Sequence, residues 1–308
     1  MYEIRFPNLG IELEKVIDGF MIGNFELRLY GIIIALGFIM AYVIVSKEAV
    51  RTKQDPELYL DCMLWMVVPA ILGARLYYVL FSLDEYIKEG QSLGDTLLSM
   101  INIRNGGLAI YGGIIAGIIT LVIFAKKRNV SPLLMMDTAC MGLLIGQIMG
   151  RWGNFFNREA FGGYTDSLFA MAIPVDWFGS KNYLLSTVNN GVITQEMIDN
   201  VLIVGGKEFI QVHPTFLYES LWNLGVLLVI FLYRRHKKFD GELLAMYIWG
   251  YGLGRVWIEG LRTDSLMLFG MNFRVSQLLA ALCVVGASIY IAYKRAKLSK
   301  VVVEEQKE

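Results

Sequence analysis

Apolar stretches alternate with short charged segments along most of the chain. Seven stretches are long enough, at roughly 20 residues, to cross the ~30 Å hydrocarbon core of a bilayer as helices. They cover residues 28–46, 60–81, 107–125, 133–152, 214–233, 241–260 and 274–293. The pattern therefore predicts an all-α integral membrane protein with seven transmembrane helices.

Basic residues at the ends of these stretches predict the orientation. They follow the first, third, fifth and seventh stretches: Lys47, Arg51 and Lys53; Lys126, Lys127 and Arg128; Arg234, Arg235, Lys237 and Lys238; Lys294, Arg295, Lys297 and Lys300. All four flanks share one side of the membrane, and cytoplasmic flanks carry an excess of Lys and Arg. The N-terminus is therefore expected outside the cytoplasm and the C-terminus within it.

The polar segments complete the domain organisation. Residues 1–27 are expected to form an exported N-terminal segment, residues 28–293 the transmembrane domain, and residues 294–308 a cytoplasmic tail. The N-terminal segment lacks the positive start and early apolar core of a cleaved signal peptide, so it is expected to be retained. An extracytoplasmic insertion, 153–212, contains a Gly-Gly turn before a possible strand at 208–212.

Composition supports a membrane location. The 308 residues are 56% hydrophobic and 18% charged, against about 45–50% and 25% in soluble domains. A net charge of zero argues against a nucleic-acid-binding surface. Cys62, Cys140 and Cys283 lie far apart inside apolar stretches, which predicts buried thiols. With two histidines and no metal-binding spacing, neither a metal nor another cofactor is expected.

The sixth stretch carries a polar stripe. Tyr251, Arg255, Glu259 and Arg262 are spaced i, i+4, i+8 and i+11, which places them on one helix face. Arg255 and Glu259 can pair along that face, and Arg262 adds a cation that this pair does not cancel. A self-neutralising ion pair is one explanation, and an anion-binding face is the other.

The fourth stretch has a similar stripe. Its members are Gln147, Arg151, Asn154 and Arg158, with Asn157 and Glu159 beside them. Two guanidiniums and several amides would then meet at the outer end of this helix. Because the arginine fork matches phosphate oxygens, Arg151 together with Arg255 and Arg262 predicts an anion site.

Further polar residues occupy the predicted exported ends of other stretches. They are Tyr30, Gly107, Tyr111, His213 and Glu219. Tyr30 alone fits an interface aromatic and His213 a structural role, whereas glycines beside Tyr111 let a ligand approach the backbone. Arg75 either joins this group or extends to the interface. A cluster of this chemistry at one leaflet predicts a site for an anionic lipid head group.

Residues 150–162, Gly-Arg-Trp-Gly-Asn-Phe-Phe-Asn-Arg-Glu-Ala-Phe-Gly, resemble the signature of the prolipoprotein diacylglyceryl transferase family. Three other blocks agree in order and spacing: the Gly-Gly-Leu block at 106–113, His-Pro-Thr-Phe-Leu-Tyr-Glu at 213–219, and Gly-Arg-Val-Trp-Ile-Glu at 254–259. The resemblance covers about residues 25–295, the whole predicted membrane region.

The resemblance implies an activity. The family transfers the diacylglyceryl group of phosphatidylglycerol to the lipobox cysteine thiol of a preprolipoprotein, forms a thioether and releases glycerol phosphate, as the first step of lipoprotein maturation. It implies a multi-pass enzyme of the bacterial cytoplasmic (inner) membrane, with its active site toward the extracytoplasmic side. The expected partners are phosphatidylglycerol, the lipobox peptide and the bilayer, with no metal.

The resemblance also implies roles for single residues. Arg151 would bind the phosphate, ordered by Asn154 and Glu159, while Arg255 and Glu259 match a second essential pair. Tyr30 and Tyr251 match family positions too. The remaining predicted substrate-binding residues are Gly107, Asn157, His213, Glu219 and Arg262.

Tyr111 departs from the family pattern, because many members carry a histidine there that is proposed as the base. A phenol with a pKa near ~10 is a weak partner for a thiol with a pKa of ~8.5. Tyr111 is therefore expected to act as a catalytic hydrogen-bond donor, or another residue is the base: His213, Glu219 or Glu259. The thiol can also ionise in the arginine field alone.

Three other functions compete with this hypothesis. A transporter or channel predicts charges near mid-membrane and symmetry between halves, whereas here the charges gather at one interface. An acyltransferase with His-x-x-x-x-Asp is excluded, because Tyr218 and Gly241 stand five residues after the two histidines. A non-catalytic lipid-binding protein would tolerate loss of Glu159 or Glu259.

Overall fold

The computed structural model describes residues 2–87, 92–103, 106–179, 184, 188, 192–265 and 274–305. The chain forms two compact units. The first unit comprises Met1–Val43 and Cys140–Glu308, and the second comprises Ile44–Ala139. Helices α1 (Leu29–Arg51) and α6 (Pro132–Asn157) each begin in one unit and end in the other.

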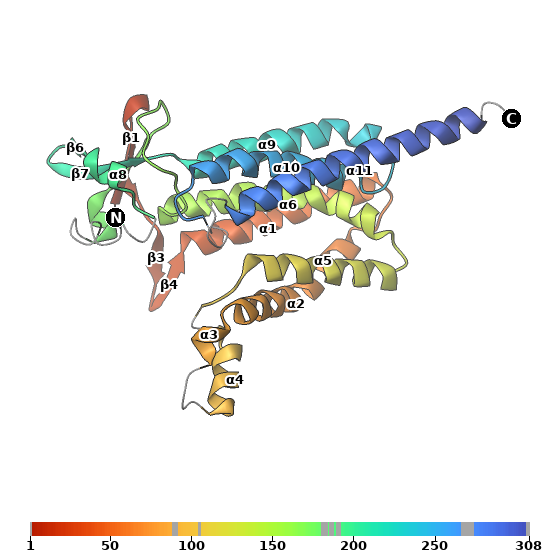
Figure 1. The fold of residues 1–308 in the computed structure, drawn as a ribbon, viewed down its shortest axis with the longest axis horizontal. Helices are drawn as coiled ribbons and strands as arrows, with labels where there is room; N and C mark the ends of the chain where they lie inside the picture. Colours follow the sequence, from red (N-terminus) through yellow and green to blue (C-terminus); the bar gives the residue numbers. More distant parts are fainter. Residues whose placement is uncertain are drawn as a thin grey trace. The chain divides into compact units, whose positions relative to one another are not determined.

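Long helices make up most of the first unit. Besides parts of α1 and α6, they are α9 (Thr215–Tyr233), α10 (Glu242–Leu261) and α11 (Val275–Glu305). They run beside one another, with a small sheet at one end and the C-terminus at the other (Figure 1). Helix α10 packs against both α9 and α11.

Helices occupy all seven predicted stretches, and six of those described are long and apolar enough to cross a membrane. These six are Leu29–Arg51, Glu57–Phe81, Ile110–Lys127, Pro132–Asn157, Thr215–His236 and Val275–Lys300. The seventh, α10, has 20 residues but carries Arg255 and Glu259 within its length. The protein is thus a mostly helical multi-pass membrane protein.

A five-stranded antiparallel sheet joins two distant parts of the sequence. Its order is β2-β1-β5-β7-β6. The strands are β1 (Tyr2–Phe6), β2 (Ile11–Val16), β5 (Met171–Pro174), β6 (Leu202–Val204) and β7 (Lys207–Val212). Arg5 pairs with Ala172, so the N-terminal segment and the 153–212 insertion form one structure. The sequence did not predict these N-terminal strands.

The predicted turn and strand in the insertion are confirmed. Gly205 and Gly206 both have positive φ, 60° and 78°, as a two-residue hairpin of type I′ requires. They connect β6 to β7, which contains the predicted strand at 208–212.

Shorter elements complete the first unit. A second hairpin, β3 (Gly19–Ile22) with β4 (Phe25–Arg28), leads directly into α1. The others are the helix α8 (Gln195–Asp199) and the 3₁₀ turns Pro7–Leu9, Val175–Phe178 and Arg234–His236.

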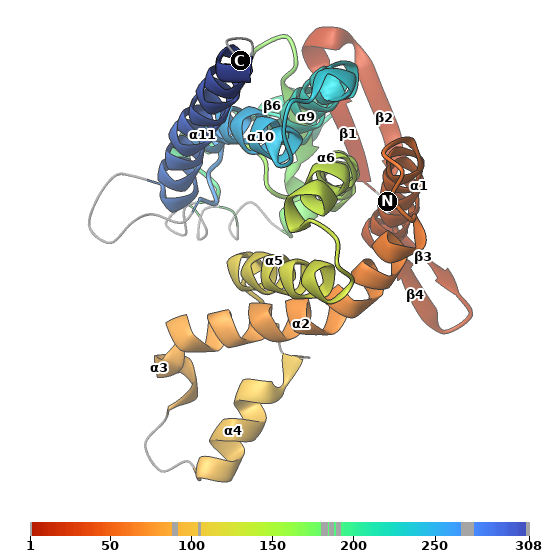
Figure 2. The same cartoon turned by 90° about the vertical axis from the view of Figure 1, so that its right-hand side faces the viewer.

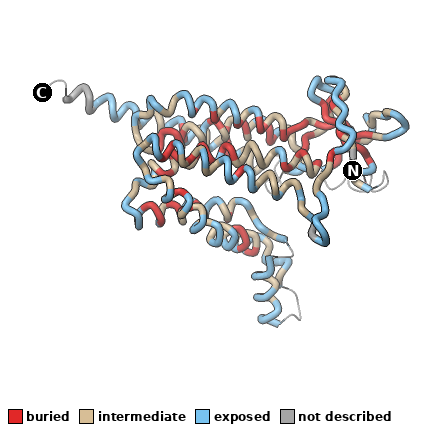
Figure 3. Tube along the Cα trace, turned by 180° about the vertical axis from the view of Figure 1, so that it is seen from behind, coloured by how far each residue is buried: buried red, intermediate tan, exposed pale blue. Residues whose placement is uncertain are grey.

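The core under the sheet extends into the 150–162 stretch. Ile4 and Ile173 of the sheet are fully buried in one cluster with Phe155, Phe161 and Phe216. The Phe155 ring lies 4.7 Å from that of Phe216 at the start of α9. Buried positions gather in this sheet and along the inner sides of the neighbouring helices (Figure 3). The aromatic half of the stretch is therefore structural, and it anchors the polar half.

In the second unit, α2 (Glu57–Phe81) and α5 (Ile110–Lys127) lie side by side (Figure 2). Two short helices, α3 (Leu83–Tyr86) and α4 (Leu93–Ile101), follow α2. The crossing of α2 and α5 is tight, since a Cβ on Gly112 would lie 2.2 Å from the Gly73 carbonyl oxygen. Only glycine permits such close backbone contact between helices.

Arg75 on α2 does not extend to the interface. Its side chain is 6% exposed and donates to four backbone carbonyls. They are those of Ser99 (2.8 Å), Met100 (2.7 Å), Gly106 (2.7 Å) and Gly107 (2.9 Å). The last carbonyls of α4 have no partner within their own helix, and a cation suits them. Arg75 therefore fixes the segment that enters α5.

We expect Gly112→Ala to lower the stability of the protein by about 1–3 kcal/mol, because the added methyl overpacks the α2–α5 crossing. Gly113→Ala is the matched control, since its Cβ would meet the nearest atom at 3.4 Å, an ordinary contact. Thermal unfolding in detergent measures both. Equal melting temperatures for the two variants would contradict the tight crossing.

Candidate active site

A buried carboxylate on α9 joins two arginines from neighbouring helices. Glu219 is 2% exposed. Its Oε2 lies 2.7 Å from Arg151 Nε on α6, and its Oε1 accepts a hydrogen bond of 2.8 Å from Arg255 Nη1 on α10. The structure thus brings Arg151 and Arg255 together, and a carboxylate of the protein lies between their two guanidiniums.

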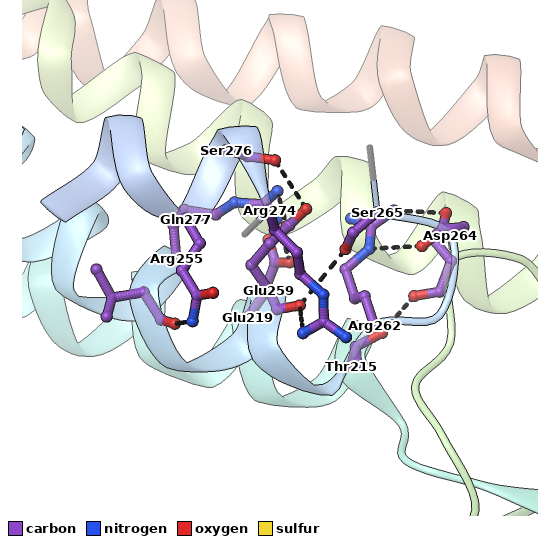
Figure 4. Close-up of polar contacts among 12 residues, drawn as sticks. Thr215, Glu219, Arg255, Glu259, Arg262, Asp264, Ser265, Arg274, Ser276 and Gln277 are labelled. Atoms are coloured by element: carbon purple, nitrogen blue, oxygen red, sulfur yellow. Dashed lines mark hydrogen bonds and ion pairs between the residues drawn. The ribbon is translucent and has the colours of Figure 1, made fainter. Parts of the chain in front are cut away.

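A second carboxylate extends the cluster to α11. Arg255 also pairs with Glu259, one turn further along α10, as the spacing predicted. Ser276 Oγ donates to Glu259 Oε1 at 2.8 Å, and Arg274 Nη1 donates to the Glu259 backbone carbonyl at 2.6 Å (Figure 4). The start of α11 therefore fixes the end of α10.

The four charges of this arginine–carboxylate cluster, Arg151, Glu219, Arg255 and Glu259, sum formally to zero. Buried ions are tolerated when each has a partner of opposite charge. The side chains of Arg151 and Arg255 stay 19% and 14% exposed. A guanidinium has five N–H donors, and the contacts of Arg151 to Glu219 and Asn154 engage only two of its three nitrogens. An anion can therefore still bind to Arg151.

Arg262 is not the uncancelled cation that the sequence predicted. It follows the last residue of α10 with extended backbone and forms a fork with Asp264, at 2.9 Å and 2.7 Å (Figure 4). Burial would raise the pKa of the Asp264 carboxyl, but the hydrogen bonds and charge of Arg262 outweigh it and hold that pKa below its usual range. The helix ends before the stripe does, so Arg262 turns to another partner.

Arg158 leaves its predicted stripe for the same reason. It follows the end of α6 with a φ of 51° and is 2% exposed. Its Nη2 donates to the Val16 carbonyl at 2.7 Å, and its guanidinium lies 4.3 Å from the Trp177 ring centre. Arg158 therefore ties the sheet to α6 and adds no second guanidinium to the stripe.

The amides of the 150–162 stretch connect Arg151 to Glu159. Arg151 Nη1 donates to Asn154 Oδ1 at 3.4 Å, and Asn154 Nδ2 donates to Glu159 Oε1 at 2.9 Å. Asn157 Nδ2 reaches the same oxygen at 3.3 Å. The structure thus brings these four predicted residues together.

Two cavities flank Glu159. They have volumes of about 390 and 320 Å³, and Asn157, Glu159 and Trp177 line both. The larger cavity is also lined by Asp18, Arg28, Tyr30 and Gly31. The smaller one is also lined by Arg158, Ala160, Phe161, Phe178, Val192, Thr263 and Asp264. Volumes of this size are typical of small ligand sites.

Two predicted tyrosines lie in the same unit. The Tyr30 ring packs against Gly153, where an added Cβ would lie 2.5 Å from the ring. Tyr251 stacks on Tyr247, whose hydroxyl accepts a 2.8 Å hydrogen bond from Gln147. Both contacts tie an aromatic ring to α6.

His213 lies where three segments meet. Its backbone N–H donates to Gly163 at 3.0 Å, and its carbonyl accepts from Gly162 at 3.0 Å. A Cβ on Gly162 would lie 2.8 Å from both the His213 Cβ and the Leu261 carbonyl, so glycine is required there. Burial lowers the pKa of His213, because the charged imidazolium loses its hydration there.

Tyr111 and Gly107 belong to the second unit. Tyr111 is the second residue of α5, and its ring centre lies 6.4 Å from that of Tyr77. Gly107 has a φ of 78°, and its carbonyl accepts from Arg75. Their participation in the site remains a prediction.

The apolar helices, the buried arginine–carboxylate cluster and the adjoining cavities define a multi-pass membrane protein with a polar site at one end of its helices. The family model for prolipoprotein diacylglyceryl transferase matches residues 18–293. The chain therefore belongs to this family, and it is an enzyme of the transferase class.

Named relatives agree along nearly the whole chain. Phosphatidylglycerol--prolipoprotein diacylglyceryl transferase 1 of Clostridium perfringens is 41% identical over 282 residues, covering 90% of this chain and 95% of the relative. The transferase of Streptococcus pneumoniae serotype 4 is 40% identical over 288 residues, covering 92% and 97%. That of Halalkalibacterium halodurans is 38% identical over 276 residues, covering 90% and 85%.

We expect Glu219→Gln to lower the free energy of unfolding by about 3–5 kcal/mol, because Arg151 then loses its carboxylate partner and Arg255 keeps only Glu259 in a mostly buried cluster. Glu196→Gln on α8 is the control, since that side chain is exposed, and it should change stability by less than about 0.5 kcal/mol. Thermal unfolding in detergent compares them. A Glu219→Gln protein as stable as the control would show that the bridge contributes nothing.

Proposed function

We propose that the chain transfers the diacylglyceryl group of phosphatidylglycerol to the lipobox cysteine thiol of preprolipoproteins, forming a thioether and releasing glycerol phosphate. The names of its relatives support the donor lipid and the prolipoprotein acceptor. The observation that carries the proposal is the pair of partly exposed guanidiniums, Arg151 and Arg255, held by one buried carboxylate.

The reaction is a displacement at a glycerol carbon. The thiol sulfur forms a bond to that carbon, the carbon–oxygen bond to phosphate breaks, and the thiol loses its proton. Negative charge grows on the departing phosphate oxygen, so donors already oriented toward it stabilise the transition state. Arg151 and Arg255 supply these donors without reorganising, because Glu219 and Glu259 fix their positions.

The other roles follow from this arrangement. Asn154 orders Arg151 and Glu159. Tyr30, Asn157 and Glu159 line the larger cavity, where they contact a substrate. The remaining residues of the first unit shape the site: Tyr251 beside the arginines, and His213 and Arg262 around Gly162. Tyr111 and Gly107 are proposed as site residues on the family resemblance alone.

The same proposal includes the membrane orientation. The enzyme lies in the bacterial cytoplasmic membrane with seven spans, the N-terminus outside, and the site toward the extracytoplasmic side. Two observations support this orientation. The cluster lies at the sheet end of α6, α9 and α10. Arg234 follows the last residue of α9, and Arg295 lies in the C-terminal half of α11, away from the sheet. Residues 294–308 then form a cytoplasmic tail.

Purified protein, phosphatidylglycerol and a lipobox peptide should yield a diacylglyceryl-thioether peptide, detected by mass spectrometry. Arg151→Ala and Glu259→Ala should lower the rate by at least about 10²-fold, the usual effect of removing preorganised charge stabilisation, while the protein still inserts. Arg128→Ala is the control, because its ion pair with Asp61 is half exposed and lies in the second unit. Near-normal turnover in either site variant would place the site elsewhere.

A further inference from the structure

Glu159 differs from the other carboxylates at the site in its partners. Glu219 and Glu259 each contact a guanidinium. Glu159 accepts hydrogen bonds from two neutral amides, those of Asn154 and Asn157, and both reach the same oxygen, Oε1. Among the described residues, no ion pair to Glu159 is found, and its second oxygen, Oε2, keeps its lone pairs for a substrate.

The paired carboxylates are poorly suited to accept a proton. Glu219 and Glu259 position Arg255 through their contacts, and a proton on either carboxylate would break those contacts. Removing that positioning in the middle of the reaction would weaken the site that holds the phosphate. A proton acceptor at this site must therefore be a carboxylate that holds no arginine.

His213 is also less suited than Glu159. Its ring Nδ1 lies 3.4 Å from the Tyr218 hydroxyl, and His213 is not among the residues that line the two cavities. Glu159 lines both cavities and is exposed. Tyr30 and Trp177 line the larger cavity together with Glu159, so a substrate group that enters this cavity meets Glu159 directly.

Glu159 is linked to the phosphate-binding arginine by a single side chain. Asn154 donates to Glu159 and accepts from Arg151. One amide therefore sets the distance between the proton acceptor and the cation that stabilises the leaving group. A nucleophile and a leaving group must lie on opposite sides of one carbon, and this fixed spacing suits such a displacement.

Resting on the function proposed above, we propose that Glu159 is the general base that takes the proton of the peptide thiol, which enters the cavity of about 390 Å³. The thiol proton moves to Glu159 Oε2 as the sulfur lone pair forms the bond to the glycerol carbon. The electrons of the breaking carbon–oxygen bond move to the phosphate oxygen of glycerol phosphate, which Arg151 stabilises. Glu159 then releases the proton to water through its exposed side.

The other charged groups at the two cavities leave this role open. They are Asp18, Arg28, Arg158 and Asp264. Arg28 pairs with Asp18 and with Glu26, each at 3.0 Å. Asp264 pairs with Arg262, and Arg158 donates to backbone carbonyls. None of these contacts involves Glu159.

The test is the pH dependence of kcat/KM for Glu159→Gln, measured with a lipobox peptide between pH 6 and 9.5. At pH 7 the variant should lose about 30-fold, because only about 3% of a thiol with a pKa of ~8.5 is ionised there without a base. Its rate should then rise about tenfold per pH unit toward the thiol pKa of ~8.5, because an ionised thiol needs no base. A selenocysteine peptide, whose selenol is already ionised at pH 7, should restore most of the loss.

Two further variants separate chemistry from geometry. Asn154→Ala should lower the rate by a similar factor at every pH and should not be rescued by the selenol, because it also frees Arg151, whose stabilisation of the leaving group an ionised selenol does not replace. Glu159→Asp keeps a carboxylate and should retain the pH profile of the unmodified enzyme at a reduced rate. Glu196→Gln serves as the unaffected control.

Three outcomes would overturn a part of this account. A pH-independent loss in Glu159→Gln without selenol rescue overturns the base assignment and leaves Glu159 a positioning residue. Selenol rescue of Tyr111→Phe, with none of Glu159→Gln, assigns the base to Tyr111. If the unmodified enzyme forms no thioether at any pH, the proposed function itself fails, and this inference fails with it.

Discussion

The burial of Glu219 between two guanidiniums is the constraint on which the site depends. Arg151 and Arg255 come from α6 and α10, and neither position could hold an arginine near hydrocarbon without a partner. Because Glu219 lies on α9, one carboxylate fixes three helices at once. Glu259 and Ser276 continue the network to α11. The charges of the cluster thus cancel, and the two arginines keep partly exposed donors, which suits the phosphate site proposed above.

The sheet holds the other side of the same site. Phe155 and Phe161 belong to the core beneath the sheet, whereas Asn154 and Glu159 face the cluster and the cavities. The stretch 150–162 therefore has two kinds of residue with two tasks. Arg158 fixes its end to Val16 of β2. Through this tie, strands at the start of the chain position the residues of the proposed site.

The apolar stretches were sufficient to predict the seven helices, and the i, i+4 spacing was sufficient to predict the Arg255–Glu259 pair. Both predictions depend only on local sequence. The placement of Arg158 and Arg262 on the two helix stripes was wrong. Periodicity assumes a helix that continues, and both residues follow a helix end. Asp264, two residues beyond Arg262, offered a local signal that was missed. Tertiary contacts determine the rest: neither the bridge at Glu219, nor Ser276, nor the pairing of Arg5 with Ala172 has a sequence signature.

The most direct test of the account is the position of the lipid head group in an experimental structure of the enzyme with phosphatidylglycerol in a lipid nanodisc. The account predicts the phosphate within about 4 Å of the Arg151 or Arg255 guanidinium, the range of a charge-assisted contact, with Glu219 still between the two arginines. A head group bound elsewhere, with both arginines engaged only by Glu219 and Glu259, would contradict it.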